Sequence, residues 1–160
     1  MDRRTLTCCF TGHRNIKASI VPAIMKRTEE AIRTLIGNGV IYYNVGGAVG
    51  YDTLAAELLF RLKETEFPQI QIILMYPFDG FTATWDDEDR ERYARLLPKY
   101  DSRICVAQKA TREAYLLRDR CLVDSASYCI SYCTRRSGGT AYTVRYAQKQ
   151  NVMIIETAQL

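Results

Sequence analysis

A chain of 160 residues, with 48% hydrophobic and 25% charged residues, has the composition of an ordinary soluble protein and can bury the core of one domain. No apolar run approaches the roughly 20 residues of a membrane span, and the N-terminus shows no signal or transit peptide. These features exclude a membrane partner and predict one cytoplasmic domain over residues 1–160. The formal net charge of +4 suits an anionic small molecule and makes nucleic acid a less favoured partner.

Short apolar segments typical of buried strands alternate along the chain with segments of helical periodicity. The predicted strands cover residues 6–10, 40–45, 70–76, 103–107, 128–133 and 152–155. The predicted helices cover approximately residues 19–36, 52–64, 85–97, 111–126 and 140–150. This alternation predicts an α/β fold with a mostly parallel central sheet of about six strands, right-handed crossovers and helices on both faces.

Glycine-containing loops join three of the predicted strands to the helices that follow them. These loops are residues 11–14, residues 44–52 and residues 135–143. Ligands of parallel α/β sheets bind outside the carboxyl ends of the strands, near the point where the strand order reverses. All three loops lie on that edge, so they predict a ligand site there.

The loop at residues 135–143 has the composition of a phosphate site. Gly138 and Gly139 let backbone amides approach a ligand without an obstructing Cβ, and the following helix offers free N–H groups and the positive end of its dipole. Ser137 and Thr140 add hydroxyl groups. The alternative is a strand-to-helix turn that uses glycine for its geometry and Ser or Thr as a cap.

Several single residues near the loops have two interpretations each. The only histidine, His13, is either a phosphate donor or acid–base group, or a structural hydrogen bonder. Asp52 either binds a ribose hydroxyl or caps its own helix. Arg14, Arg118 and Arg136 offer the planar fork of donors that binds phosphate, or they form surface ion pairs.

Known cofactor and metal patterns are not evident in the sequence. Neither G-x-x-x-x-G-K-[ST] nor G-x-G-x-x-G occurs, which disfavours a P-loop nucleotidase and a standard NAD dehydrogenase. The six cysteines form no C-x-x-C pair and are expected to be buried free thiols. The acids at residues 86–89 match a helix dipole better than a metal site. We therefore expect no metal and no obligatory cofactor, only a nucleotide-type ligand.

Four motifs, taken in order along the chain, resemble the YpsA-like branch of the SLOG superfamily. They are TCCFTGHR at residues 7–14, GGAVGYD at residues 46–52 followed by Ala-Ala-Glu at 55–57, Arg118 with Val123-Asp124, and SGGTAYT at residues 137–143. The resemblance spans nearly the whole chain. It implies a single Rossmann-like domain that binds nucleotides or nucleotide derivatives such as ADP-ribose or NAD, related to the LOG phosphoribohydrolases and to DNA-processing protein A.

This resemblance defines the expected ligand-binding residues, which come from all three loops and one helix. They are Thr11, Gly12, His13, Arg14, Gly46, Gly47, Gly50, Asp52, Arg118, Ser137, Gly138, Gly139 and Thr140. The identity of the ligand stays open. The oligomeric state also stays open, so a second copy of the chain remains a candidate partner.

The chain departs from the LOG enzymes at one position that matters for mechanism. Those enzymes are similar in carrying a G-G-x-G-T-x-x-E loop, and Thr143 stands where their glutamate is expected. This departure favours binding or sensing over hydrolysis. An alternative N-glycosidic phosphoribohydrolase acting on nucleoside monophosphates would need Glu57, Asp124 or His13 as its catalytic group.

A single-stranded DNA-binding module is the third interpretation. It rests on the positive charge and on eleven tyrosines that could stack on bases. Most of these tyrosines fall within predicted strands or helices, where packing is the ordinary explanation, so the sequence favours the small-molecule ligand.

Overall fold

The computed structural model describes residues 2–158, in which six strands form one sheet. All five strand pairs are parallel, and the order is β4-β3-β2-β1-β5-β6. The strands are β1 (Thr7–Gly12), β2 (Tyr42–Val45), β3 (Gln71–Tyr76), β4 (Ser102–Cys105), β5 (Tyr128–Tyr132) and β6 (Met153–Glu156). The predicted α/β fold with a parallel sheet is confirmed.

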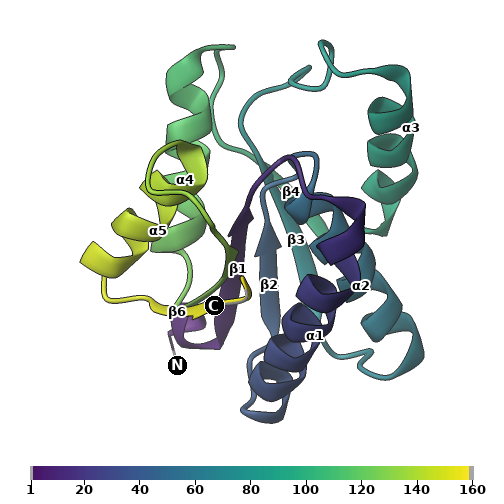
Figure 1. Cartoon of the computed structure of the whole chain (residues 1–160), viewed down its shortest axis with the longest axis vertical. Coiled ribbons are helices and arrows are strands. Elements are labelled where there is room, and N and C mark those ends of the chain that lie inside the picture. Colours follow the sequence, from purple (N-terminus) through teal and green to yellow (C-terminus); the bar gives the residue numbers. More distant parts are fainter. Residues whose placement is uncertain (1, 159–160) are drawn as a thin grey trace.

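Five α-helices cover the two faces of this sheet (Figure 1). They are α1 (Val21–Gly37), α2 (Tyr51–Thr65), α3 (Asp87–Leu96), α4 (Arg112–Asp124) and α5 (Gly139–Lys149). Short 3-10 turns occupy Arg3–Leu6, Ala18–Ile20 and Leu97–Lys99. Helices α1 and α2 pack on one face, with α3 beside α2, and α4 and α5 pack together on the other. No helix in residues 2–158 is long and apolar enough to cross a membrane.

Strand β1 shows why both faces need a helical cover. Successive side chains of a strand point to opposite faces, and here every residue from Thr7 to Thr11 is buried. Cys8 and Phe10 join the core beneath α1 and α2, whereas Cys9 joins the core beneath α4 and α5. A strand buried on both faces explains the uninterrupted apolar run in the sequence.

The strand order reverses between β1 and β5. From β1 the chain steps outward through β2 and β3 to β4, and α4 then returns it across the sheet to β5, on the other side of β1. The loops after β1 and β5 therefore flank the reversal, where parallel sheets bind their ligands. Two of the three glycine loops, residues 11–14 and residues 135–143, therefore lie at the reversal of the strand order.

Strand β4 corresponds to the strand predicted for residues 103–107, but it differs from the central strands in its exposure. It lies at the edge of the sheet, and all four of its residues are exposed. For this reason Cys105 is exposed, contrary to the expectation of a buried thiol. Cys8, Cys9 and Cys129, on the central strands, are the buried free thiols that the sequence predicts, whereas Cys121 and Cys133 are only half-buried.

Tyr51, the first residue of α2, holds the first two glycine loops together. Its backbone N–H donates to the His13 carbonyl oxygen at 3.1 Å, and its buried hydroxyl lies 2.7 Å from the Thr28 hydroxyl of α1. Its ring packs directly on Gly12, where an added Cβ would come within 2.4 Å. Gly50 lies equally close to the Arg14 backbone and has a φ of +86°, which favours glycine. Close packing between loops thus accounts for both glycines.

We predict that Gly12→Ala destabilises the protein by at least about 2 kcal/mol, because the new methyl group overpacks against the fully buried Tyr51 ring. Urea unfolding of the unliganded protein measures the effect. Gly37→Ala is the matched control: it lies in α1 with no described atom within 4 Å of an added Cβ, so its stability should stay equal or rise by up to about 1 kcal/mol. Equal midpoints for the two variants would contradict the packing role of Gly12.

Candidate functional site

A cavity of about 410 Å³ lies at the carboxyl ends of the strands. Its wall is built by the end of β1 and the loop after it, the loop after β2 with the first turn of α2, the segment before α3 with the first turn of that helix, and parts of α4 and α5. The lining residues are Phe10, Thr11, Gly12, Arg14, Ala48, Asp52, Phe81, Thr84, Trp85, Asp86, Asp89, Tyr115, Arg118, Asp119, Leu122, Gly139 and Thr140. Convergent polar groups in a concave apolar wall are the usual features of a small-molecule site.

Seven of the residues expected to bind ligand meet in this cavity. They are Thr11, Gly12, Arg14, Asp52, Arg118, Gly139 and Thr140. In the described part of the chain, the other six lie behind or beside the lining: His13, Gly46, Gly47, Gly50, Ser137 and Gly138. Gly46 and Gly47 are packing positions like Gly12, since an added Cβ would lie 2.9 Å from the Asp52 carboxylate or 2.7 Å from Leu74.

His13 connects the loop after β1 to the loop after β5. Its Nε2 accepts a hydrogen bond from the Thr134 backbone N–H at 2.8 Å, and its ring packs edge-on against Tyr132. Burial, followed by the charge of Arg135, lowers the pKa of His13 below its ordinary value. The contacts of His13 are those of a structural hydrogen bonder. The Nε2 lone pair that a general base would use already accepts the Thr134 N–H.

A buried guanidinium lies between two carboxylates on one side of the cavity. Arg118 is only 6% exposed and donates to the Gly46 carbonyl oxygen at 2.6 Å and to the Asp119 carboxylate at 2.8 Å. Asp52 accepts the Ala48 backbone N–H at 3.1 Å, so it fastens the loop that precedes its helix. The Nε and Nη1 of Arg118 are thus tied to a carboxylate and a loop carbonyl oxygen, and its role as a phosphate partner stays a prediction.

Burial changes the protonation of both carboxyl groups. It raises the pKa of Asp52 to about 6, against the opposing pull of Arg118 and the Ala48 N–H. Burial also raises the pKa of Asp119, again opposed by Arg118. Acids with perturbed pKa values in a cavity often mark functional sites. Asp119 was not among the predicted site residues, and its only sequence signal is its place beside Arg118 in a predicted helix.

The N-terminus of α5 faces the cavity with free backbone donors. Its N-cap, Gly138, has a φ of +98° and makes no side-chain cap, and no acidic residue occupies the first turn. Gly139 lines the cavity, and no described atom lies within 4 Å of a Cβ added there. A serine or threonine cap, the alternative expected from sequence, is not formed in this helix. The open space at Gly139 leaves room for a ligand beside the amides.

Aromatic side chains form part of the cavity lining, an aromatic wall that the sequence did not predict. Phe81 and Trp85, between β3 and α3, contact each other edge-to-face with ring centroids 5.4 Å apart. Tyr115 of α4 also lines the cavity and remains 38% exposed. The segment at residues 79–84 reads as a polar connection in sequence. The sequence signal for this wall was the pair Phe81 and Trp85, two aromatic residues four positions apart.

The two carboxylates proposed as replacements for the LOG glutamate lie elsewhere in the described structure. Glu57 forms a bidentate ion pair with Arg92 of α3, with one contact at 2.8 Å. Asp124, at the C-terminal end of α4, accepts from the Tyr146 hydroxyl at 2.7 Å. Neither residue lines the cavity.

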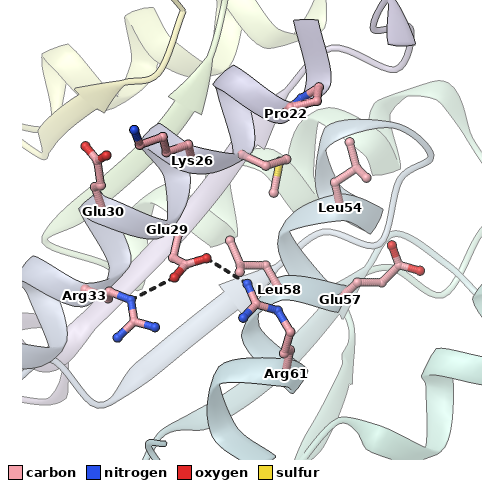
Figure 2. Close-up of a pocket in the computed structure, with 10 residues that line it drawn as sticks. Pro22, Lys26, Glu29, Glu30, Arg33, Leu54, Glu57, Leu58 and Arg61 are labelled. Atoms are coloured by element: carbon pink, nitrogen blue, oxygen red, sulfur yellow. Dashed lines mark hydrogen bonds and ion pairs between the residues drawn. The ribbon is translucent and has the colours of Figure 1, made fainter. Parts of the chain in front are cut away.

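Glu57 borders a second, wider groove of about 690 Å³ between α1 and α2 (Figure 2). Figure 2 shows Glu29 bridged to Arg33 and Arg61, at 2.9 and 2.7 Å. Glu29, Arg33 and Arg61 in this groove pair with one another, and none of the three glycine loops lines it. The smaller cavity is therefore the better candidate site.

Comparison with known proteins agrees with the fold and the motifs. The YpsA family model, described as the YspA SLOG family, matches residues 8–158. The UPF0398 protein of Shouchella clausii is 31% identical over 97 residues, which are 61% of this chain and 52% of that protein. The UPF0398 protein of Lysinibacillus sphaericus is 23% identical over 141 residues, 86% of this chain and 78% of that one. The match therefore spans about half the length of the Shouchella relative.

Two solved structures share the architecture. DNA processing protein A of Helicobacter pylori, which binds single-stranded DNA, superposes with a TM-score of 0.66 at 18% identity, over 98% of this chain and 67% of that one. The Streptococcus pneumoniae protein superposes with a TM-score of 0.68 at 13% identity, over 96% of this chain and 50% of that one. At these identities the likeness establishes the Rossmann-like fold alone.

We predict that Asp52→Asn flattens the pH dependence of stability. The folded-state pKa of about 6 exceeds the ordinary 3.8, so the folded protein binds more protons between these values, and the free energy of unfolding falls as pH rises from about 4 to 6. At pH 7 the variant should be more stable by up to about 3 kcal/mol. Urea unfolding across pH 4–8 measures this. Glu88→Gln, an exposed acid of α3, should change little, and a steeper slope in Asp52→Asn would contradict the assignment.

Proposed function

The chain belongs to the YspA SLOG family, and we propose that it binds a nucleotide or nucleotide derivative in the cavity at the carboxyl edge of its sheet. One observation carries the proposal. An uncapped, acid-free helix N-terminus, the buried carboxyl group of Asp52 with the half-buried one of Asp119, and an aromatic wall converge on one cavity. These are the three kinds of group that recognise a phosphate, a sugar and a base.

The phosphate binds at the first turn of α5. Backbone N–H groups and the helix dipole favour an anion at Gly139 and Thr140, and the exposed Arg14 lines the same cavity. Arg118 acts indirectly, because its bonds to Gly46 and Asp119 position the neighbouring loop and carboxylate. His13 likewise positions the loop after β5 through Thr134.

The sugar and base occupy the remainder of the cavity. Hydroxyl groups of a ribose donate to Asp52 and Asp119, which are acceptors when ionised. The base packs on Phe81, Trp85 and Tyr115, whose flat apolar rings suit stacking. We further propose a cytoplasmic location, in keeping with six cysteines that are free thiols.

We predict that a nucleotide at 100 times its dissociation constant raises the unfolding free energy by about 2.7 kcal/mol, and the melting temperature by roughly 5–10 °C. Differential scanning fluorimetry with nucleoside mono- and diphosphates, ADP-ribose and NAD measures the shift. Gly139→Val should abolish it, because the branched side chain fills the space beside the amides. The unliganded melting temperature should change little, since that space is otherwise empty.

Gly139→Ala provides a graded comparison, with a smaller side chain and a smaller loss of the shift. Wild-type binding by Gly139→Val would show that the loop is only a turn. Single-stranded DNA, which the Helicobacter pylori neighbour binds, belongs in the same panel. Oligonucleotide binding that weakens steeply with salt, without any nucleotide response, would favour a nucleic-acid interface instead.

A second candidate function is hydrolysis of the N-glycosidic bond of a nucleoside monophosphate. Its supporting observation is Asp119, a largely buried carboxyl group that lines the cavity, whereas Glu57 and Asp124 do not. In this reaction water adds to C1′ of the ribose while the C1′–N bond breaks. Asp119 donates the proton that leaves with the base and recovers one from the attacking water.

We predict, for this second candidate, that Asp119→Asn abolishes release of free base from AMP while retaining nucleotide binding. Chromatographic detection of the base measures the reaction, and Glu57→Gln serves as the control because that residue lies outside the cavity. Absence of base release from the unmodified protein would remove the hydrolase and leave the binding function standing.

A further inference from the structure

The cavity has charged groups of both signs, and they are unevenly distributed. Four carboxylates and two guanidiniums line it: Asp52, Asp86, Asp89, Asp119, Arg14 and Arg118. With all six ionised, the lining has a formal excess of two negative charges. A site of this kind is poorly suited to a ligand that carries several phosphates along its length.

Among the described helices whose first turns contribute to the cavity lining, only α5 has an N-terminus free of both acids and side-chain caps, since Asp52 lies in the first turn of α2. At α3 the Asp86 side chain accepts the Asp89 backbone N–H at 2.9 Å, and Asp87, Glu88 and Asp89 place three acids in the first turn. These carboxylates offset the helix dipole and repel a phosphate. At α5 the first turn is free of acids and side-chain caps. The two helices lie toward opposite sides of the sheet's carboxyl edge (Figure 1).

The guanidiniums do not provide a second phosphate position. Arg118 is only 6% exposed, and its Nε and Nη1 already donate to Asp119 and to the Gly46 carbonyl oxygen, so little of its guanidinium is open to a ligand. Among the described lining residues this leaves Arg14, which is exposed, to assist the phosphate at α5. A second phosphate would lie against the acids of α3 or project into solvent.

The volume of the cavity also favours a ligand smaller than a dinucleotide. About 410 Å³ lies near the lower end of the range of small-molecule sites. A dinucleotide has roughly twice the bulk of a mononucleotide, so much of it would remain outside a cavity of this size. Parts of a ligand left in solvent add little affinity.

Resting on the proposed nucleotide-binding function, we infer that the site selects a nucleoside monophosphate over ADP-ribose and NAD, with Asp89 as a specificity-determining residue. The single phosphate occupies the α5 end, the nucleoside lies along the aromatic wall, and the half-buried Asp89 disfavours a second phosphate at the α3 end. Repulsion between the Asp89 carboxylate and a second phosphate discriminates against ADP-ribose and NAD, in addition to any attraction for the monophosphate.

Isothermal titration with AMP, ADP-ribose and NAD at pH 7.5 and low salt tests the inference. We expect the dissociation constant of AMP to be at least tenfold lower than those of the other two ligands. Asp89→Asn should narrow this ratio at least threefold, while the AMP dissociation constant changes less than twofold. Asp87→Asn is the matched control, because its carboxylate is 87% exposed on the same helical turn and lies outside the cavity.

The outcomes separate the inference from the function on which it rests. Equal or tighter binding of ADP-ribose or NAD would overturn the inference while supporting nucleotide binding. If the ratio of the ADP-ribose or NAD dissociation constant to that of AMP is the same in Asp89→Asn and Asp87→Asn, the role of Asp89 is overturned. Failure of all three ligands to bind the folded protein would overturn the proposed function and the inference together.

Discussion

The packing of Tyr51 against Gly12 is the contact on which the site geometry depends. A fully buried tyrosine at the start of α2 fills the space that a side chain at Gly12 would occupy, and its N–H bonds the His13 carbonyl oxygen. Its ring also lies near Tyr132 of β5, with centroids 5.9 Å apart, and its hydroxyl reaches Thr28 of α1. Tyr51 therefore connects the first two glycine loops, helices α1 and α2, and strand β5.

The cavity combines this rigid frame with charges that are costly to bury. Arg118, Asp52 and Asp119 lose much of their hydration, and the raised pKa values of the two acids express that cost. Burial of ions rarely stabilises a fold as well as apolar packing does, so their presence fits a site that recognises polar groups. The Ala48 amide and the Gly46 carbonyl oxygen compensate in part, because they tie the charged side chains to the loop after β2.

The proposed function follows from the difference between two helix ends. The N-terminus of α3 is capped and acidic, whereas that of α5 has neither an acid nor a side-chain cap. The same cavity is lined by the carboxyl groups of Asp52 and Asp119 and by the aromatic wall. A ligand with one anionic end, hydroxyl groups and a flat ring matches these groups. Family membership agrees with the fold but leaves the ligand to be determined by such contacts.

The sequence alone was sufficient to predict the parallel α/β fold and its helical cover, and it pointed to the sheet edge where the candidate cavity lies. Apolar runs and helical periodicity are local properties, and strict alternation of strands and helices leaves few other topologies. The loop at Gly138 and Gly139 was also recognisable, because a strand followed by glycines and a helix places free amides at a known edge. Its assignment to a phosphate remains a prediction.

Only the tertiary structure decided what most individual residues contact. A glycine required by a ligand and one required by close packing look identical in sequence. An added Cβ would meet the Tyr51 ring at Gly12, the Asp52 carboxylate at Gly46 and the Arg14 backbone at Gly50. Asp119 and Trp85 reach the cavity because α4 returns across the sheet and the segment before α3 folds over the edge. Such contacts join residues far apart in the chain, and their formation depends on side-chain packing and strand order, which local patterns do not specify.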